Sequence, residues 1–323
     1  MKKRILSTIT SSLLLLSGVA LAGDKIDESL PTTADGRLSI DVMNGEVKIK
    51  TWNKNEVKVV GELDDDAEGY QFESTEDGRV VFRVEMPKRR WGNWDDSGSN
   101  LEFWLPENNN LRFEGVNADV DVENVMGGAK VNTVNGNVEA KSLKGRVNQE
   151  TVNGKIKTSG LEGKIKLNTV NGTIEDRNSS GDVNFETVNG DIESNTTAAD
   201  IDISNVNGDM DLELSLVKEL EISTVNGDIE LELSIEERSR VFISTVGGDA
   251  DIKFNGTLSA DFNIEAHSGG DIRNKLTKDK VKRDRYGPGE TLEFKVGKGE
   301  AEIEIETVGG DITIEQGSKI KLK

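Results

Sequence analysis

Apolar residues recur along the middle of the chain at alternating steps of four and five positions. The series runs through Val134, Val138, Leu143, Val147, Val152, Ile156, Leu161, Ile165, Val170 and Ile174. The mean step is about 4.5 residues, whereas an amphipathic helix requires about 3.6. A second apolar residue often follows two positions later, as at Leu167, Phe185, Ile203 and Leu212, with Lys, Asp or Asn between them. This period-two alternation predicts short β-strands that bury one side in a narrow interior.

An Asn-Gly pair marks one turn of each repeat. Five pairs are spaced by 18 residues and a sixth follows after 19: Asn135-Gly136, Asn153-Gly154, Asn171-Gly172, Asn189-Gly190, Asn207-Gly208 and Asn226-Gly227. A weaker turn lies midway, as at Lys144-Gly145 and Glu162-Gly163, so each unit holds two strands and two turns. The repeat predicts an all-β fold, a parallel β-solenoid with coils of about 18 residues and two short strands each.

Equivalent residues of successive coils should lie side by side, because strands one coil apart pair about 4.8 Å from each other. The turn asparagines should then form a column in which side-chain amides hydrogen-bond as a ladder. We expect Gly172 and Gly190 at positive-φ positions within these turns. Later turns at Gly247-Gly248, Gly269-Gly270 and Gly309-Gly310 predict that the coils continue in sequence order.

The chain divides into a leader, a cap and a repeat. Residues 115–323 are expected to form the solenoid, with an insertion at 273–298. Residues 23–114 are rich in β-pattern but irregular, with Leu38, Ile40 and Val42 followed by Asn44-Gly45, which resembles the later turns. We expect this region to form wider starting coils and an N-terminal β cap.

Residues 1–22 have the pattern of a signal peptide. Lys2, Lys3 and Arg4 precede an apolar stretch, and Ala20-Leu21-Ala22 is a small-x-small cleavage site. The sequence therefore predicts an exported protein, in the bacterial periplasm or on the cell surface, with no integral membrane span after cleavage. Cleavage removes three cations and no acids, which changes the formal net charge from −20 to −23. An acidic chain of this kind is not expected to bind nucleic acid.

Composition removes several kinds of chemistry. The chain has no Cys and one His, His267. It therefore lacks a thiol nucleophile, a disulfide framework, a Cys-ligated zinc site and a two-His metal site. No cofactor is predicted. A polysaccharide-active enzyme would need paired carboxylates in one cleft, and no pair stands out from the repeat.

Aspartates follow the turn glycine in the later coils and predict an acidic column along one edge. The favoured interpretation is a solvated edge that discourages aggregation. Calcium bridging at Asp191, Asp209 and Asp228 is the second hypothesis, since calcium takes six to eight oxygen ligands and a flat column presents few together.

Two segments interrupt the repeat and are candidates for partner binding. The first, RRWGNWDDSGSN, contains Trp91 and Trp94, which offer either a ligand-stacking surface or, with Trp52 and Trp104, a cover for the open core. The second, KDKVKRDRYGPGE, is the main basic patch of the sequence. Its cations are Lys278, Lys280, Lys282, Arg283 and Arg285. We expect replacement of all five to weaken binding of an anionic partner without lowering thermal stability.

The strings LEFWLPENNNLRFEGVNADVDVENV, the TVNG repeats and DIRNKLTKDKVKRDRYGPGETLEFKVGKGEAEIEIETVGGDITI together resemble the DUF4097 family of adhesin-like β-strand-repeat proteins. The resemblance covers nearly all of the mature chain and implies a β-solenoid of the cell envelope, with no active site to carry over. It favours a non-catalytic scaffold that binds an envelope component or a glycan. A regulatory partner of a membrane sensor in envelope-stress signalling is the alternative, and a polysaccharide-active β-helix enzyme is less favoured.

Overall fold

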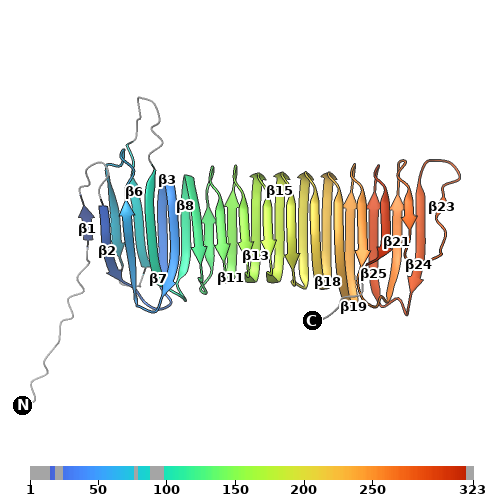
Figure 1. Cartoon of the computed structure of the whole chain (residues 1–323), viewed down its shortest axis with the longest axis horizontal. Helices are drawn as coiled ribbons and strands as arrows, with labels where there is room; N and C mark the ends of the chain where they lie inside the picture. Colours follow the sequence, from blue (N-terminus) through green and yellow to red (C-terminus); the bar gives the residue numbers. More distant parts are fainter. Residues whose placement is uncertain (1–14, 19–24, 76–78, 88–97, 318–323) are drawn as a thin grey trace, which may run out of the picture.

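The computed structural model describes residues 15–18, 25–75, 79–87 and 98–317, which form strands joined by turns. All the strands belong to one hydrogen-bonded sheet, wound into a rod whose strands run across its long axis (Figure 1). None of these residues is helical, so the predicted all-β class is confirmed. It follows that no helix in the described ranges could span a membrane.

The rod has two faces, each built by strands of successive coils. Face A contains β1 (Leu15–Gly18), β5 (Gly69–Ser74), β6 (Arg79–Glu85), β9 (Ala129–Asn132), β11 (Lys144–Thr151), β13 (Glu162–Asn171), β15 (Ser180–Asn189), β17 (Asp200–Asn207), β21 (Ala260–Ala266), β23 (Lys282–Arg283), β24 (Glu290–Val296) and β25 (Ala301–Thr307). Face B contains β2 (Lys25–Pro31), β4 (Glu56–Glu62), β7 (Ser99–Pro106), β10 (Val138–Lys141), β12 (Ile156–Ser159), β14 (Ile174–Arg177), β16 (Ile192–Thr196), β20 (Ala250–Phe254), β22 (Ile272–Asn274) and β26 (Ile312–Gln316). Four long strands pass from one face to the other: β3 (Arg37–Trp52), β8 (Asn110–Glu123), β18 (Met210–Asn226) and β19 (Ile229–Thr245).

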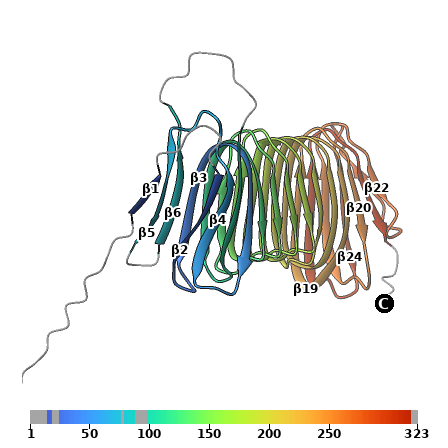
Figure 2. The same ribbon diagram turned by 60° about the vertical axis from the view of Figure 1, so that its left-hand side comes forward.

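Parallel pairing at an offset of 18 residues organises the central coils. On face A, Ile165 of β13 pairs with Val183 of β15, and on face B, Ile174 of β14 pairs with Ile192 of β16. These four side chains are buried, while the alternate residues face outward. The apolar periodicity of the sequence therefore fills the narrow interior between the two faces, and Figure 2 shows the coils stacked one behind another.

The two ends of the rod depart from sequence order. Near the N-terminus, β3 lies between β8 on one side and β6 and β7 on the other. Beyond them, β5 and β4 pair antiparallel with β6 and β7. Near the C-terminus, β25 and β26 lie between β19–β20 and β21–β22, and β24 pairs antiparallel with β21.

The sheet is therefore mixed, and a uniform parallel solenoid of sequential two-strand coils does not describe the whole of it. In space, the turn at Gly310 lies between those at Gly248 and Gly270, so the expected order of the last coils is wrong. The physical reason is the antiparallel hairpin at the end. It reverses the chain, so that residues 301–316 return between two earlier coils. The outer strand, β23, is only two residues long and carries Lys282 and Arg283, which protects the sheet edge.

Phenylalanines fill the core at both ends. Phe82 meets Phe103 edge-on at 5.1 Å near the N-terminus, and Phe262 stacks on Phe294 at 4.5 Å near the C-terminus. The predicted cover by Trp52 and Trp104 is wrong. Their rings stack on each other at 6.3 Å and remain partly exposed, because both residues occupy outward positions of their strands.

The turns contain an asparagine ladder. Each amide donates from Nδ2 to Oδ1 of the preceding coil at 2.7–3.0 Å, linking Asn44, Asn117, Asn135, Asn153, Asn171, Asn189, Asn207 and Asn226. The first member, Asn44, donates to Oδ2 of buried Asp64 at 3.3 Å. Every amide of the column therefore donates to an acceptor, and the positive end of the aligned amide dipoles meets a carboxylate.

Close approach between coils requires glycine in these turns. Gly172 is not at positive φ, and Gly190, at 159°, is close to extended. A Cβ on Gly172 would lie 1.9 Å from the carbonyl oxygen of Gly154, and one on Gly190 would lie 2.1 Å from that of Gly172. The expected positive φ is therefore wrong at Gly172 and confirmed at Gly190, where the close approach of the neighbouring coil is a second reason for glycine.

The signal peptide at residues 1–22 remains a prediction. Residues 1–14 and 19–24 lie outside the described ranges, and Leu15–Gly18 form β1, antiparallel to β5.

Candidate binding surfaces

The acidic column is part of the backbone hydrogen-bond network. Oδ1 of Asp191 accepts the backbone N–H of Asp209 at 3.0 Å, and Oδ1 of Asp209 accepts that of Asp228 at 2.9 Å. The series continues from Asp228 to Asp249, Asp311 and Asp271. The bond from the Asp271 N–H lowers the pKa of the Asp311 carboxyl. The column thus provides acceptors for turn N–H groups that face away from the strand ladder.

This geometry does not support the hypothesis that calcium binds to the acidic column. One oxygen of each carboxylate of Asp191, Asp209 and Asp228 already accepts a backbone hydrogen bond. Within the described ranges, no three acidic or imidazole side chains converge as a metal site. The residues present do not form the six-oxygen to eight-oxygen shell that calcium requires.

The predicted basic patch splits into two groups. Lys278, Lys280 and Arg285 are exposed, and no ion pair joins them to the described residues. Lys282 instead pairs with Glu293 at 3.1 Å, and Arg283 pairs with Glu290 at 2.6 Å. Only part of the predicted cluster is therefore free to meet an anionic partner.

Arg283 has a structural role that the sequence did not indicate. Its partner Glu290 is only 6% exposed, and the other Glu290 oxygen accepts the backbone N–H of Ile272 at 2.8 Å. Removal of Arg283 would leave a buried carboxylate without its counter-ion. The expectation that all five cations are replaceable without loss of stability is therefore not supported at Arg283. Trp91 and Trp94 lie outside the described residues.

A second group of cations lies on face A, near the N-terminal end of the rod. These residues line a groove of about 720 Å³, together with Ser39, Val81, Asn110, Leu111, Ala129 and Asn148. The cations of this basic groove are Arg37, Arg79, Arg83, Arg112, Lys130 and Arg146. None of the described residues that line it is a carboxylate, although the chain carries 60 acids.

The strand order assembles the basic groove. Arg37 of β3 pairs with Arg79 of β6, and Arg112 of β8 pairs with Lys130 of β9. Next to β9 lies β11, which carries Arg146. Each strand of the groove therefore contributes at least one cation, and all of them point outward from face A.

Sequence analysis missed the basic groove because its members are scattered over more than a hundred residues. A signal existed in the repeat itself, since Arg112 and Lys130 are 18 residues apart, as are Arg146 and Lys164. Arg37 and Arg79 had no such signal. Their place depends on the out-of-order strands at the N-terminal end, which the repeat does not predict.

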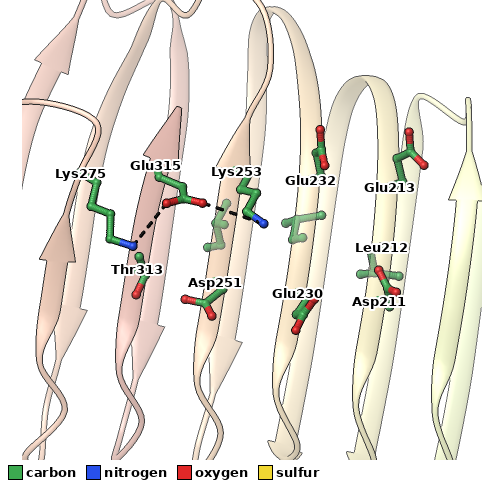
Figure 3. Close-up of a pocket in the computed structure, with 12 residues that line it drawn as sticks. Asp211, Leu212, Glu213, Glu230, Glu232, Asp251, Lys253, Lys275, Thr313 and Glu315 are labelled. Carbon is green, nitrogen blue, oxygen red and sulfur yellow. Dashed lines mark hydrogen bonds and ion pairs between the residues drawn. The ribbon is translucent and has the colours of Figure 1, made fainter. Parts of the chain in front are cut away.

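Face B carries an acidic groove of about 260 Å³ towards the C-terminal end (Figure 3). Its carboxylates come from neighbouring strands and include Asp211 and Glu213 of β18, Glu230 and Glu232 of β19, Asp251 of β20 and Glu315 of β26. Lys253 and Lys275 flank Glu315 at 3.9 and 3.3 Å. The basic groove and this acidic groove thus lie on different faces and towards opposite ends of the rod.

One carboxylate lies inside the rod. Asp176 is 1% exposed and accepts hydrogen bonds from the hydroxyls of Thr158 at 2.6 Å and Ser179 at 2.5 Å. Burial raises the pKa of its carboxyl, and these hydroxyls partly offset that effect. Asp176 occupies an inward position of β14, so its role is in the packing of the coil rather than on a binding surface.

The winding of the sheet, the amide ladder and the sorted surface charges together define an all-β repeat scaffold. The chain belongs to the Toastrack DUF4097 family, which it matches over residues 35–315. Among solved structures, it is similar to a "putative cell adhesion protein" of Clostridium sporogenes. That similarity has 12% sequence identity and a TM-score of 0.23, and it covers 91% of this chain and 100% of that one. No curated protein matches the chain.

Proposed function

We propose that this chain is a non-catalytic, exported β-scaffold that binds a component of the bacterial envelope or cell surface through the outward faces of its coils. The observation that carries the proposal is the sorting of charge on those faces. A groove whose described lining holds six cations and no carboxylate has formed on a chain with a formal net charge of −20. Like charges at neighbouring strands repel one another, so the cations of the groove that have no acidic partner carry a cost in the free protein that a bound anion would relieve.

Membership of the Toastrack DUF4097 family supports the scaffold part of this proposal. The fold supports it as well, because the ladder and the acidic column hold the coils in strict register and keep the outward side chains in straight columns. A rigid array of this kind suits recognition of an extended partner, since little side-chain order must be gained on binding.

The test is sedimentation of the purified protein with bacterial envelope fragments, over a range of fragment concentrations. We expect saturable co-sedimentation that weakens as salt increases. Envelope polysaccharide incubated with the protein should show no new reducing ends or unsaturated products. Absence of binding would overturn the scaffold function, and product release would replace it with catalysis. Capture through a membrane sensor protein alone would favour the regulatory alternative.

A further inference from the structure

The cations of the basic groove follow one another along the rod axis. They come from five neighbouring strands, β6, β3, β8, β9 and β11, which at about 4.8 Å per strand span about 19 Å along the rod. The pairing continues to Lys164 of β13, which lies beside Arg146. A small anion would meet two of these side chains, whereas an extended one can meet them all.

Three cations of the groove are available for a ligand. Arg83 is held by Asp41 at 3.0 Å and Arg112 by Glu114 at 2.5 Å. Arg37, Lys130 and Arg146 have no ion pair with any residue in the described ranges, and they come from three different strands. Arginine presents five N–H donors in a planar fork that matches carboxylate, phosphate or sulfate oxygens.

The charge of face A reverses at β15, the second strand beyond the groove. In the strand register, Lys164 lies beside Asp182 of β15, and Asp182 lies beside Asp200 of β17. An anionic polymer would therefore be attracted over the first strands and repelled over the next ones. This reversal limits the bound segment to the N-terminal part of the rod.

The lining of the groove favours a polysaccharide over other polyanions. Among the described residues that line it none is aromatic, so these residues offer nucleic-acid bases no surface on which to stack. Leu111 and Ala129 are buried, so Val81 is the one partly exposed apolar side chain among the described lining residues, and a single valine offers little surface for an acyl chain. A nucleic-acid duplex carries one charge per about 1.7 Å, whereas neighbouring strands place cations about 4.8 Å apart, so the groove would neutralise only part of the duplex charge.

We propose that the basic groove binds a linear acidic polysaccharide, lying along the rod axis with its carboxylate, phosphate or sulfate groups on Arg37, Lys130 and Arg146. This inference rests on the proposed scaffold function and gives that scaffold a ligand class and a site. The acidic strands beyond the groove determine where the polymer must end or turn away.

The experiment compares two triple variants with the same change in net charge. The groove variant is Arg37→Ser, Lys130→Ser and Arg146→Ser. The control is Lys278→Ser, Lys280→Ser and Arg285→Ser, which removes exposed cations at the other end of the chain. Binding of the purified proteins to polygalacturonate, dextran sulfate and uncharged dextran is measured at low salt, after thermal unfolding has shown that all three proteins are folded.

We expect wild type and control to bind at least one of the two acidic polymers and not dextran, and the groove variant to lose at least tenfold in affinity. Equal losses in both variants would mean that net charge alone is responsible and would overturn the site. Tighter binding of a DNA duplex than of either polymer would overturn the ligand class. Envelope binding that survives in the groove variant would overturn this inference but leave the scaffold function intact.

Discussion

Asn226 donates its side-chain amide to Oδ1 of Asn207 at 3.0 Å, although 19 residues rather than 18 separate the two. The additional residue is accommodated at the opposite turn of the coil. There, Leu216 has a φ of 58° and is 60% exposed, and the offset between paired residues changes from 18 at Thr196 and Leu214 to 19 at Asp200 and Glu219. The ladder turn therefore sets the register of the coil, and the opposite turn tolerates variation in length.

Interruption of the ladder should weaken the rod measurably. Asn171→Ala removes a donor to Asn153 and an acceptor for Asn189. We expect it to lower the free energy of unfolding by about 1–2 kcal/mol, since each lost hydrogen bond contributes about 1 kcal/mol. Urea unfolding measures the change. The exposed Lys157→Ala on face B is the control and should change stability by less than about 0.5 kcal/mol. Equal stabilities of the two variants would show that the ladder contributes nothing.

Close packing of the turns predicts a larger effect at glycine. Gly172→Ala places a methyl group 1.9 Å from a backbone oxygen of the neighbouring coil, so that coil must move. We expect a loss of more than about 2 kcal/mol, in the upper part of the range for single substitutions. Gly256→Ala is the comparison, because Gly256 has a φ of 80° and nothing within 4 Å of an added Cβ. We expect Gly256→Ala to lower the free energy of unfolding by only about 1 kcal/mol, because backbone strain is its only cost. A larger loss at Gly256 than at Gly172 would contradict this explanation.

The out-of-order coil can be tested by cross-linking, because the chain contains no cysteine. Ser244 of β19 and Glu306 of β25 are register partners on neighbouring strands. Glu306 is also the register partner of Glu265 on β21, so Glu306 lies between Ser244 and Glu265. The variant Ser244→Cys with Glu306→Cys should form a disulfide under mild oxidation, whereas Ser244→Cys with Glu265→Cys should not. The second pair is two strands apart, about 10 Å, beyond the reach of a disulfide. Peptide mapping detects the bond. The opposite result would contradict this strand order and support coils that stack in sequence order.

Asp176 should give the stability a pH dependence. Burial raises the pKa of its carboxyl in the folded protein, so the folded state binds the proton to a higher pH than the unfolded chain. Stability from this residue is therefore highest at low pH and falls as pH rises through the raised value. Relative to wild type, Asp176→Asn should gain stability between about pH 4 and pH 7. Chemical unfolding at both pH values measures this. The exposed Asp182→Asn is the control, and the same pH trend in both variants would rule out burial as the cause.

Much of the central fold could be predicted from sequence because the coils repeat. The 18-residue period places Asn153 beside Asn171 and Ile165 beside Val183, and the structure contains both pairs. The ends could not be predicted, because the return of residues 301–316 between earlier coils depends on a hairpin that the repeat does not encode. The same limit applied to the basic groove, since Arg37 and Arg79 become neighbours only through the order of strands at the N-terminal end.

The most direct test of the binding account is the salt dependence of dextran sulfate binding. Release of counterions makes the logarithm of the binding constant fall linearly with the logarithm of salt concentration, by somewhat less than one for each cation engaged. The wild-type slope should be steep. The groove variant lacking Arg37, Lys130 and Arg146 should have a slope shallower by about two to three, while the Lys278, Lys280 and Arg285 control keeps the wild-type slope. Identical slopes for wild type and the groove variant would contradict the account, because binding would then take place elsewhere on the protein.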